Sequence, residues 1–122
     1  MFEISAHYTF AAGHALRGYK GKCENVHGHN YRVEVTVAGE KLDSAGLLLD
    51  FADLRGAIKA VAEPLDHQFL NDLAPFDSLN PSAENLAQYF CEQLQSRLKN
   101  HGLRVAQVKV WETDTTSATY RP

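Results

Sequence analysis

The sequence lacks the features that define several protein classes. Its only two cysteines, Cys23 and Cys91, lie far apart without a Cys-x-x-Cys motif, so neither a disulfide scaffold nor a cysteine-ligated zinc module is predicted. No apolar run approaches the roughly 18 residues of a membrane-spanning helix. The first residues, MFEISAHYTF, do not follow the basic-then-apolar order of a signal peptide. We therefore expect a cytoplasmic protein without a membrane partner.

An excess of positive charge is also missing. The formal net charge is −3, whereas general nucleic-acid binding needs a broad basic surface, so no nucleic-acid partner is expected. The local distribution of charge is more informative. No acidic residue lies between Glu3 and Glu24, and this interval contains Arg17, Lys20 and Lys22 in a glycine-rich stretch. We expect this segment to receive an anion.

The remaining composition is that of a globular protein. With 122 residues, of which 44% are hydrophobic and 22% charged, the chain is long enough for one core, and we expect a single domain over residues 1–122. Alternating apolar and polar residues predict strands over 2–10, 31–39, 104–113 and 118–121. Helical spacing predicts one helix over 51–63, capped by Asp50, and a longer one after Asn80-Pro81-Ser82. This order, ββααββ, predicts an α+β fold in which two helices cover one face of a four-stranded antiparallel sheet.

Three histidines, His14, His27 and His29, lie between the first two predicted strands. In an extended chain the His-x-His pair places two imidazoles on the same side, and a third histidine from a neighbouring loop would complete a tripod. Three neutral nitrogen ligands leave one position of a zinc ion open, which is the arrangement of catalytic zinc sites. The spacing alone leaves metal binding and ordinary solvated loop histidines as equal alternatives.

A cysteine and a pair of neighbouring residues, one acidic and one histidine, could also take part in catalysis. Cys23 follows Lys22 in the polar loop, and cationic surroundings favour the thiolate, the form that acts as a base or nucleophile. An inert exposed cysteine is the alternative, whereas Cys91 is predicted to be a small buried residue on the second helix. The carboxylate of Asp66 could orient the imidazole of His67 for acid–base chemistry, although adjacent pairs of this kind are usually polar surface residues.

Glu112 interrupts an apolar pattern. It continues the predicted inward face of Ala106, Val108 and Val110, so its carboxylate points where an apolar side chain is expected. A carboxylate in such a place must find hydrogen-bond donors. Either a protein partner or the N–H groups of a ligand would serve.

These residues fall within short motifs along the chain: FAAGH ending at His14, Cys23-Glu-Asn-Val-His27-Gly-His29, Leu65-Asp66-His67, Asn80-Pro-Ser-Ala-Glu-Asn-Leu-Ala87 and Trp111-Glu112-Thr113. In this order they resemble the motifs of the 6-pyruvoyl-tetrahydropterin synthase family, and the resemblance spans about residues 4–121. The Cys-x-x-x-His-Gly-His string together with the partner motifs is far more specific than any one motif alone.

The resemblance implies a tunnelling fold, in which trimers close their sheets into a barrel, two trimers stack as a homohexamer, and active sites lie at subunit interfaces. It implies that zinc is bound by His14, His27 and His29. It further implies that Cys23 is the catalytic base, that Asp66 and His67 complete a proton-transfer set, and that Glu112 anchors a pterin ring. Ser82 and Ala83 resemble the family's second pterin-contacting stretch, where backbone groups would make the contacts. Ala83 departs from the pattern, because many relatives carry a hydroxyl residue there, so no side-chain hydrogen bond is expected from this position.

The implied substrate is 7,8-dihydroneopterin triphosphate, and the implied reaction is its conversion to a 6-carboxy-tetrahydropterin in queuosine biosynthesis, with release of triphosphate and acetaldehyde and no redox cofactor. Charge placement alone makes Arg17, Lys20 and Lys22 the candidates for binding the triphosphate. Two alternatives remain open. One is a family member that makes the 6-pyruvoyl product, and the other is a non-catalytic oligomer that binds zinc or a pterin.

Overall fold

A computed structural model describes residues 1–19 and 21–122 of the chain, and the side chain of Cys23 lies outside this description. The predictions made for Lys20 and for the Cys23 thiol therefore fall outside the described residues. The strands are β1 (Phe2–His14), β2 (His27–Gly39), β3 (Gln68–Phe69), β4 (Arg104–Thr113) and β5 (Thr116–Tyr120). The α-helices are α1 (Phe51–Ala62) and α2 (Ala83–Leu98), and short 3-10 helices are η1 (Lys22–Glu24), η2 (Glu63–Leu65), η3 (Leu70–Asp72) and η4 (Lys99–His101).

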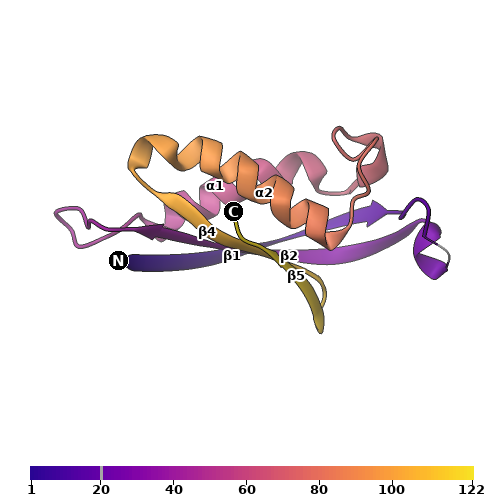
Figure 1. Cartoon of the computed structure of the whole chain (residues 1–122), viewed down its shortest axis with the longest axis horizontal. Helices are drawn as coiled ribbons and strands as arrows, with labels where there is room; N and C mark the ends of the chain where they lie inside the picture. Colours follow the sequence, from indigo (N-terminus) through magenta and orange to yellow (C-terminus); the bar gives the residue numbers. More distant parts are fainter. Residues whose placement is uncertain (20) are drawn as a thin grey trace.

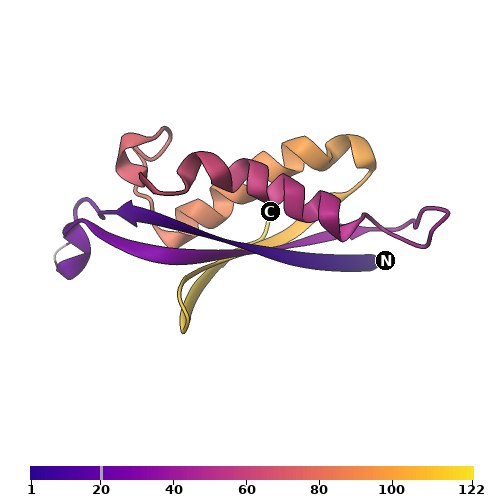
Figure 2. The ribbon, with the colours of Figure 1, turned by 180° about the vertical axis from the view of Figure 1, so that it is seen from behind.

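The strands form one five-stranded sheet in the order β3-β1-β2-β4-β5. Both helices lie on the same face of this sheet, and the ribbon leaves the opposite face uncovered (Figures 1 and 2). The α+β class and the two helices on one face are confirmed. The prediction of a four-stranded, purely antiparallel sheet was wrong, because β3 adds a fifth strand that pairs in parallel with β1 at Ala12 and Gly13. A strand of two residues is too short to show an alternating pattern in the sequence.

Strands β1 and β2 are longer than their apolar alternation predicts. They pair antiparallel without interruption from Phe2↔Gly39 to His14↔His27, so the segments next to the predicted loop are strands on both sides. The alternation fades there because Gly13 and Gly28, which face each other across the two strands, carry no side chain. Backbone hydrogen bonds continue the ladder without help from apolar side chains. The three histidines therefore lie on strands and not on loops.

The core lies between the helices and the inner face of the sheet. Val33, Val35 and Val37 of β2 are fully buried there, as their alternation predicts. On β4 the pairing register with β2 shifts between Thr36 and Val37, and Val105 is buried instead of Ala106. The predicted inward position of Ala106 was therefore wrong, because this irregularity adds a residue to β4.

The helix signals agree with the structure in most details. The side chain of Asp50 accepts a hydrogen bond from the backbone N–H of Ala52 and caps α1. Ser82 caps α2 by accepting from the backbone N–H of Asn85. Cys91 is buried on α2 as predicted, and burial, together with the nearby charge of Glu92, raises the pKa of its thiol. A thiol in this environment stays protonated and inert at neutral pH.

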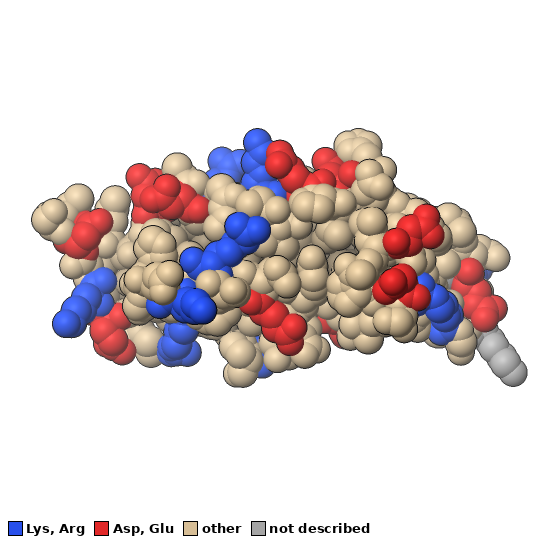
Figure 3. Space-filling model, turned by 90° about the horizontal axis from the view of Figure 1, so that it is seen from above, with Lys and Arg blue, Asp and Glu red and all other residues tan. Residues whose placement is uncertain are grey.

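Charges of both signs are interspersed on the face of the molecule that carries the helices (Figure 3). Neither sign forms a continuous patch over α1 and α2 in this view. In the part of the chain that the structure describes, no helix has the length and apolar character needed to cross a membrane.

The packing of α2 predicts a large effect of truncating one of its core residues. Leu94 is fully buried on this helix, and Leu94→Ala should lower the free energy of unfolding by about 2–5 kcal/mol, because it removes buried methyl groups and leaves a cavity. The preceding residue, Gln93, is exposed, and Gln93→Ala should change stability little, because alanine is a good helix former. Urea denaturation of both variants measures the difference. Equal midpoints would contradict this assignment of the core face.

Candidate functional site

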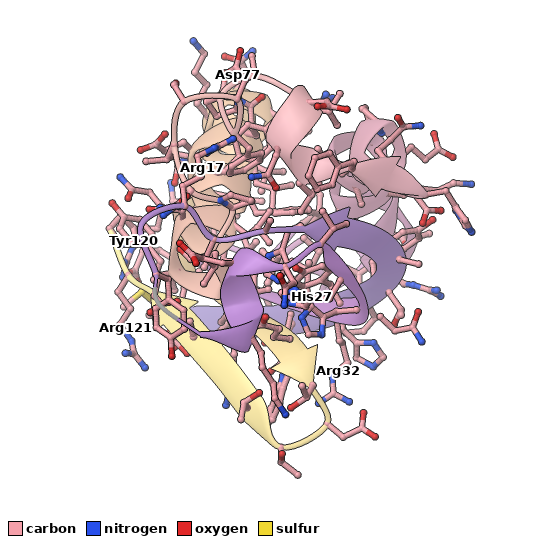
Figure 4. All side chains as sticks on the ribbon, turned by 90° about the vertical axis from the view of Figure 1, so that its right-hand side faces the viewer. Arg17, His27, Arg32, Asp77, Tyr120 and Arg121 are labelled. Atoms are coloured by element: carbon pink, nitrogen blue, oxygen red, sulfur yellow. The ribbon has the colours of Figure 1, made fainter. Side chains whose placement is uncertain are left out.

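The three histidines meet at one end of the sheet, where β1 ends and β2 begins. His14 and His27 are direct partners across the two strands, and His29 lies two residues further along β2. All three continue the inner face of the sheet, because they follow the buried positions of Phe10 and Tyr31 with a period of two. Figure 4 looks onto this end of the molecule, and His27 lies near the middle of the view. The apolar core thus passes directly into a cluster of imidazoles.

The imidazoles converge through their Nε2 atoms. The Nε2 atoms of His14 and His27 are 2.9 Å apart, and the ring centroids of the three histidines are separated by 4.5–5.0 Å. With Glu112 they form a group whose potential ligand atoms all lie within 4.8 Å of one another. His14 is fully buried, whereas the other three are half-buried. One side of the cluster is therefore closed by protein and the other faces solvent.

Backbone carbonyls fix the orientation of two of these rings. The Nδ1 of His14 lies 2.7 Å from the carbonyl oxygen of Pro81, beside the hydroxyl of Tyr31, and the Nδ1 of His27 lies 2.7 Å from that of Asn25. A carbonyl oxygen only accepts, so both Nδ1 atoms carry a hydrogen, and in the neutral form of each ring Nε2 presents a lone pair. Partners of this kind orient the histidine ligands of metal sites.

The Nε2 atoms require positive charge between them. Two lone pairs at 2.9 Å repel each other unless a proton or a metal ion lies between them. The Nε2 of His29 is buried and, among the described residues, has no hydrogen-bond partner, although a carboxylate oxygen of Glu112 is 2.8 Å away. A divalent cation among the three Nε2 atoms would satisfy all of them, so these residues fit a metal ion with nitrogen ligands.

Glu112 supplies a negative charge to the same cluster. Its Oε1 lies 3.2 Å from the Nε2 of His14 and 2.8 Å from that of His29. The hydrogen bond with His14 lowers the pKa of Glu112, and the imidazole charges add to this effect. Burial lowers the pKa of His29, although Glu112 opposes the shift. An ionised carboxylate and a neutral imidazole are the states that bind a cation. The hydrogen bond with His14 requires a proton on Nε2, so a proton and a metal ion compete for this place.

The position of Glu112 adds to what the sequence predicts. Its inward direction beside Val108 and Val110 is confirmed, since both valines are fully buried. Its carboxylate reaches the imidazoles, which makes it a candidate ligand that sequence reasoning did not identify. The signal was a carboxylate on an apolar face with no donor assigned to it. Glu112 also lines a small hollow of about 120 Å³ next to Ala83 and Ser117, so a ligand in that hollow would contact its carboxylate.

Asp66 and His67 form the predicted acid–imidazole pair. Oδ1 of Asp66 lies 3.0 Å from Nδ1 of His67 and also accepts a hydrogen bond from the backbone N–H of Ala11. His67 has a φ of 59°, a conformation that is rare for residues other than glycine. Its backbone N–H donates to the carbonyl of Ala11, and its side chain is 81% exposed. Asp66 therefore fixes one ring nitrogen of His67, and Nε2 is left for solvent or a ligand.

His67 of this pair and His29 of the histidine cluster line one cavity of about 400 Å³. Its lining includes His67 and Gln68 on one side and Gly28, His29 and Asn30 on the other. A ligand in the cavity would contact His29 and His67. Two groups of residues that are distant in the sequence are thereby brought to one place.

The remaining predicted residues lie around this end of the molecule, and they differ in how many hydrogen bonds they already make within the protein. The hydroxyl of Ser82 caps α2, and Ala83 is buried at the start of that helix. Arg17 donates from Nη2 to the carbonyl of Phe76 at 2.7 Å, and in Figure 4 it lies beside the loop that carries Asp77. Lys22 is exposed on η1. Part of the hydrogen-bonding capacity of Arg17 is thus already used within the protein, and triphosphate binding by Arg17 and Lys22 stays a prediction.

Comparisons with known proteins agree on one family. The family model described as 6-pyruvoyl tetrahydropterin synthase matches residues 3–122. The 6-carboxy-5,6,7,8-tetrahydropterin synthase of Bacillus subtilis is 35% identical, covering 99% of this chain and 86% of the relative. The 6-pyruvoyl tetrahydrobiopterin synthase of Homo sapiens is also 35% identical, covering 98% of this chain and 90% of the relative.

A solved structure shows the same fold. The 6-pyruvoyl tetrahydropterin synthase of Caenorhabditis elegans superimposes with a TM-score of 0.88 at 30% sequence identity, covering 99% of this chain and 95% of that chain. The match extends over the strands that carry the histidines as well as over both helices. This chain belongs to the 6-pyruvoyl tetrahydropterin synthase family.

Proposed function

We propose that the protein is a zinc-dependent lyase that converts 7,8-dihydroneopterin triphosphate to 6-carboxy-5,6,7,8-tetrahydropterin, with release of triphosphate and acetaldehyde, in queuosine biosynthesis. The observation that carries the proposal is the convergence of the His14, His27 and His29 imidazoles on one point, and one of them, His29, lines a cavity together with His67. Relatives from Bacillus subtilis and Haemophilus influenzae that bear the 6-carboxy name support this product. The human relative supports the 6-pyruvoyl product as the second candidate.

His14, His27 and His29 would hold the zinc ion. Their nitrogen donors suit zinc, and three protein ligands leave a position for a substrate oxygen. When bound, zinc would polarise the side-chain hydroxyls of the substrate and make the neighbouring C–H bonds more acidic. The carbonyls of Pro81 and Asn25 would keep two of the rings in the tautomer that ligates.

Proton transfer is assigned to Cys23 and His67. Cys23 belongs to η1, in the loop between His14 and His27, and its thiolate would remove a proton from the substrate side chain. His67 would return or relay protons through Nε2, since its Nδ1 is held by Asp66. A carboxylate in this position fixes the tautomer and stabilises the imidazolium that forms. Ser82 and Ala83 would contact the pterin through their backbone, and Arg17, Lys20 and Lys22 would meet the triphosphate.

Glu112 would anchor the pterin ring. The amidine edge of a pterin carries N–H groups side by side, and a carboxylate accepts two such bonds at once. The hollow between Glu112, Ala83 and Ser117 gives this edge a place to enter. For a ring to bind there, the carboxylate would have to turn from the imidazoles toward the hollow.

Assembly into a homohexamer of two trimers is part of the proposal. In the described part of the chain, β3 pairs with only Ala12 and Gly13 on the outer side of β1, and β5 forms the other edge of the sheet. The part of the β1 edge that β3 does not cover, and the outer edge of β5, could pair with strands of a second copy of the chain. A cytoplasmic location remains an expectation from the sequence.

Product analysis tests the reaction. Zinc-loaded protein incubated with 7,8-dihydroneopterin triphosphate should release acetaldehyde and form the 6-carboxy product, both detectable by mass spectrometry. Cys23→Ala should lower the rate by more than about 10²-fold, the usual effect of removing a positioned base, and should retain zinc. Release of triphosphate without acetaldehyde would identify the 6-pyruvoyl reaction. Failure to consume the substrate would favour a non-catalytic oligomer that binds zinc or a pterin.

Removing one histidine should abolish stoichiometric metal binding. The wild-type protein should hold about one zinc per chain, and His29→Ala should lose it, because two imidazoles and water make a weak site. His7→Ala is the matched control, since His7 is exposed on β1 outside the cluster. Elemental analysis after dialysis gives the zinc content. Full occupancy in His29→Ala would show that this residue is not a ligand.

Glu112→Gln separates the two possible roles of the carboxylate. As a pterin anchor, Glu112 would lose a charge-assisted pair and set one N–H group against another, so pterin affinity should fall by about 10²-fold or more with zinc retained. Glu84→Gln is the control, because Glu84 lines the same hollow but is not part of the histidine cluster. Calorimetric titration with a pterin and zinc analysis give both quantities. Loss of zinc with unchanged pterin affinity would make Glu112 a metal ligand instead.

A further inference from the structure

Two asparagine side chains continue the β1 ladder beyond His14. Oδ1 of Asn71 accepts from the backbone N–H of Ala15 at 2.9 Å, and its Nδ2 donates to the carbonyl of Ala15 at 2.8 Å. Asn80 makes the same pair of bonds with Arg17, both at 2.9 Å. Neither asparagine was identified as a site residue from the sequence.

The arrangement copies the pairing of antiparallel strands. A side-chain amide carries the same donor and acceptor as a peptide group, and in an antiparallel ladder one residue exchanges both bonds with its partner. Ala15 and Arg17 are two residues apart, so their backbone groups face the same side of an extended chain. Asn71 and Asn80 therefore do for residues 15–17 what a neighbouring strand would do. The bond from Arg17 Nη2 to the carbonyl of Phe76 ties the same two segments together again.

The same contacts lead to the His14 imidazole. Asn80 directly precedes Pro81, whose carbonyl holds Nδ1 of His14 at 2.7 Å. The backbone of Asn80 is itself fixed from α2, since Nδ2 of Asn85 donates to its carbonyl at 2.8 Å. The side chain of Asn80 thus sets the distance between the end of β1 and the carbonyl that orients His14. Asn71 holds Ala15, the next residue after His14, from the same side.

We propose that Asn71 and Asn80 are positioning residues of the metal centre. Their side-chain amides hold the backbone that follows His14, and Asn80 also holds the Pro81 carbonyl against the imidazole, so that Nε2 of His14 points at the shared ion. The inference rests on the metal centre proposed above. Residues that orient a metal ligand typically change metal affinity by 10- to 100-fold when they are replaced.

Isosteric aspartate variants test the proposal on the full chain. In Asn80→Asp and Asn71→Asp, an oxygen replaces the NH₂ group and faces the carbonyl of Arg17 or Ala15. One hydrogen bond is lost and the carbonyl is repelled. Asn100→Asp makes the same chemical change at an exposed residue of η4 and is the control. Zinc affinity is measured by competition with a chelator, ligand geometry by the visible absorption of the Co²⁺ form, and stability by melting the metal-free protein.

The expected result is a 10- to 100-fold weaker zinc affinity in Asn80→Asp and Asn71→Asp, with an altered Co²⁺ spectrum, while Asn100→Asp matches the wild type. Wild-type affinity and spectrum in both variants would overturn the proposal. A lower melting temperature with unchanged zinc affinity would also overturn it, because that result indicates a purely structural role.

Two further outcomes are distinguishable from these. If the wild type and Asn100→Asp bind neither zinc nor Co²⁺, the metal centre itself is refuted, and the positioning role fails with it. Should Asn80→Asp not fold, Asn80→Ala replaces it, because alanine adds no charge and leaves the Arg17 backbone to water. The same loss of affinity is expected for that variant, and unchanged affinity would count against the proposal.

Discussion

The pairing of β1 with β2 is the constraint on which the candidate site depends. This ladder extends to the His14↔His27 pair, beyond the last apolar residues of the core, and it alone places two of the three imidazoles opposite each other. The third follows from the two-residue period of a strand. Because the spacing is set by backbone hydrogen bonds and not by side-chain contacts, the cluster is as well defined as the sheet itself.

The sheet alone does not determine which nitrogen of each ring faces inward. That choice comes from carbonyl groups outside the sheet, at Pro81 before α2 and at Asn25 after η1. The long segment between α1 and α2 is in turn held along the edge of β1, through Asp66 at Ala11 and through β3 at Ala12 and Gly13. The Asp66–His67 pair and the carbonyl that holds His14 therefore belong to one stretch of chain that follows one strand edge.

Periodicity predicted the elements that bury an apolar face, and it failed where pairing proceeds without one. Val33, Val35 and Val37 gave a clear strand signal and are fully buried. Gly13 and Gly28 gave none, although they pair with each other, and β3 was too short to detect. The three histidines and the Asp66–His67 contact were predictable from motifs, whereas the contact of Glu112 with the imidazoles was not. Contacts made by backbone carbonyls and amide side chains follow no periodic pattern in the sequence, so only the structure reveals them.

The position of the histidines also links binding to folding. The candidate ligands lie on two long strands, at the end where the ladder would otherwise fray, so a bound ion would cross-link β1 and β2. An ion that binds only the folded chain adds RT ln(1 + [L]/Kd) to the free energy of unfolding, about 2.7 kcal/mol at a hundred times Kd. The effect would be seen first in local opening of the sheet. The backbone amides of β1 next to Gly13 would exchange their hydrogens more slowly, because the opening of that end would require release of the ion. Metal supply in the cell would then govern the lifetime of the folded protein as well as its chemistry.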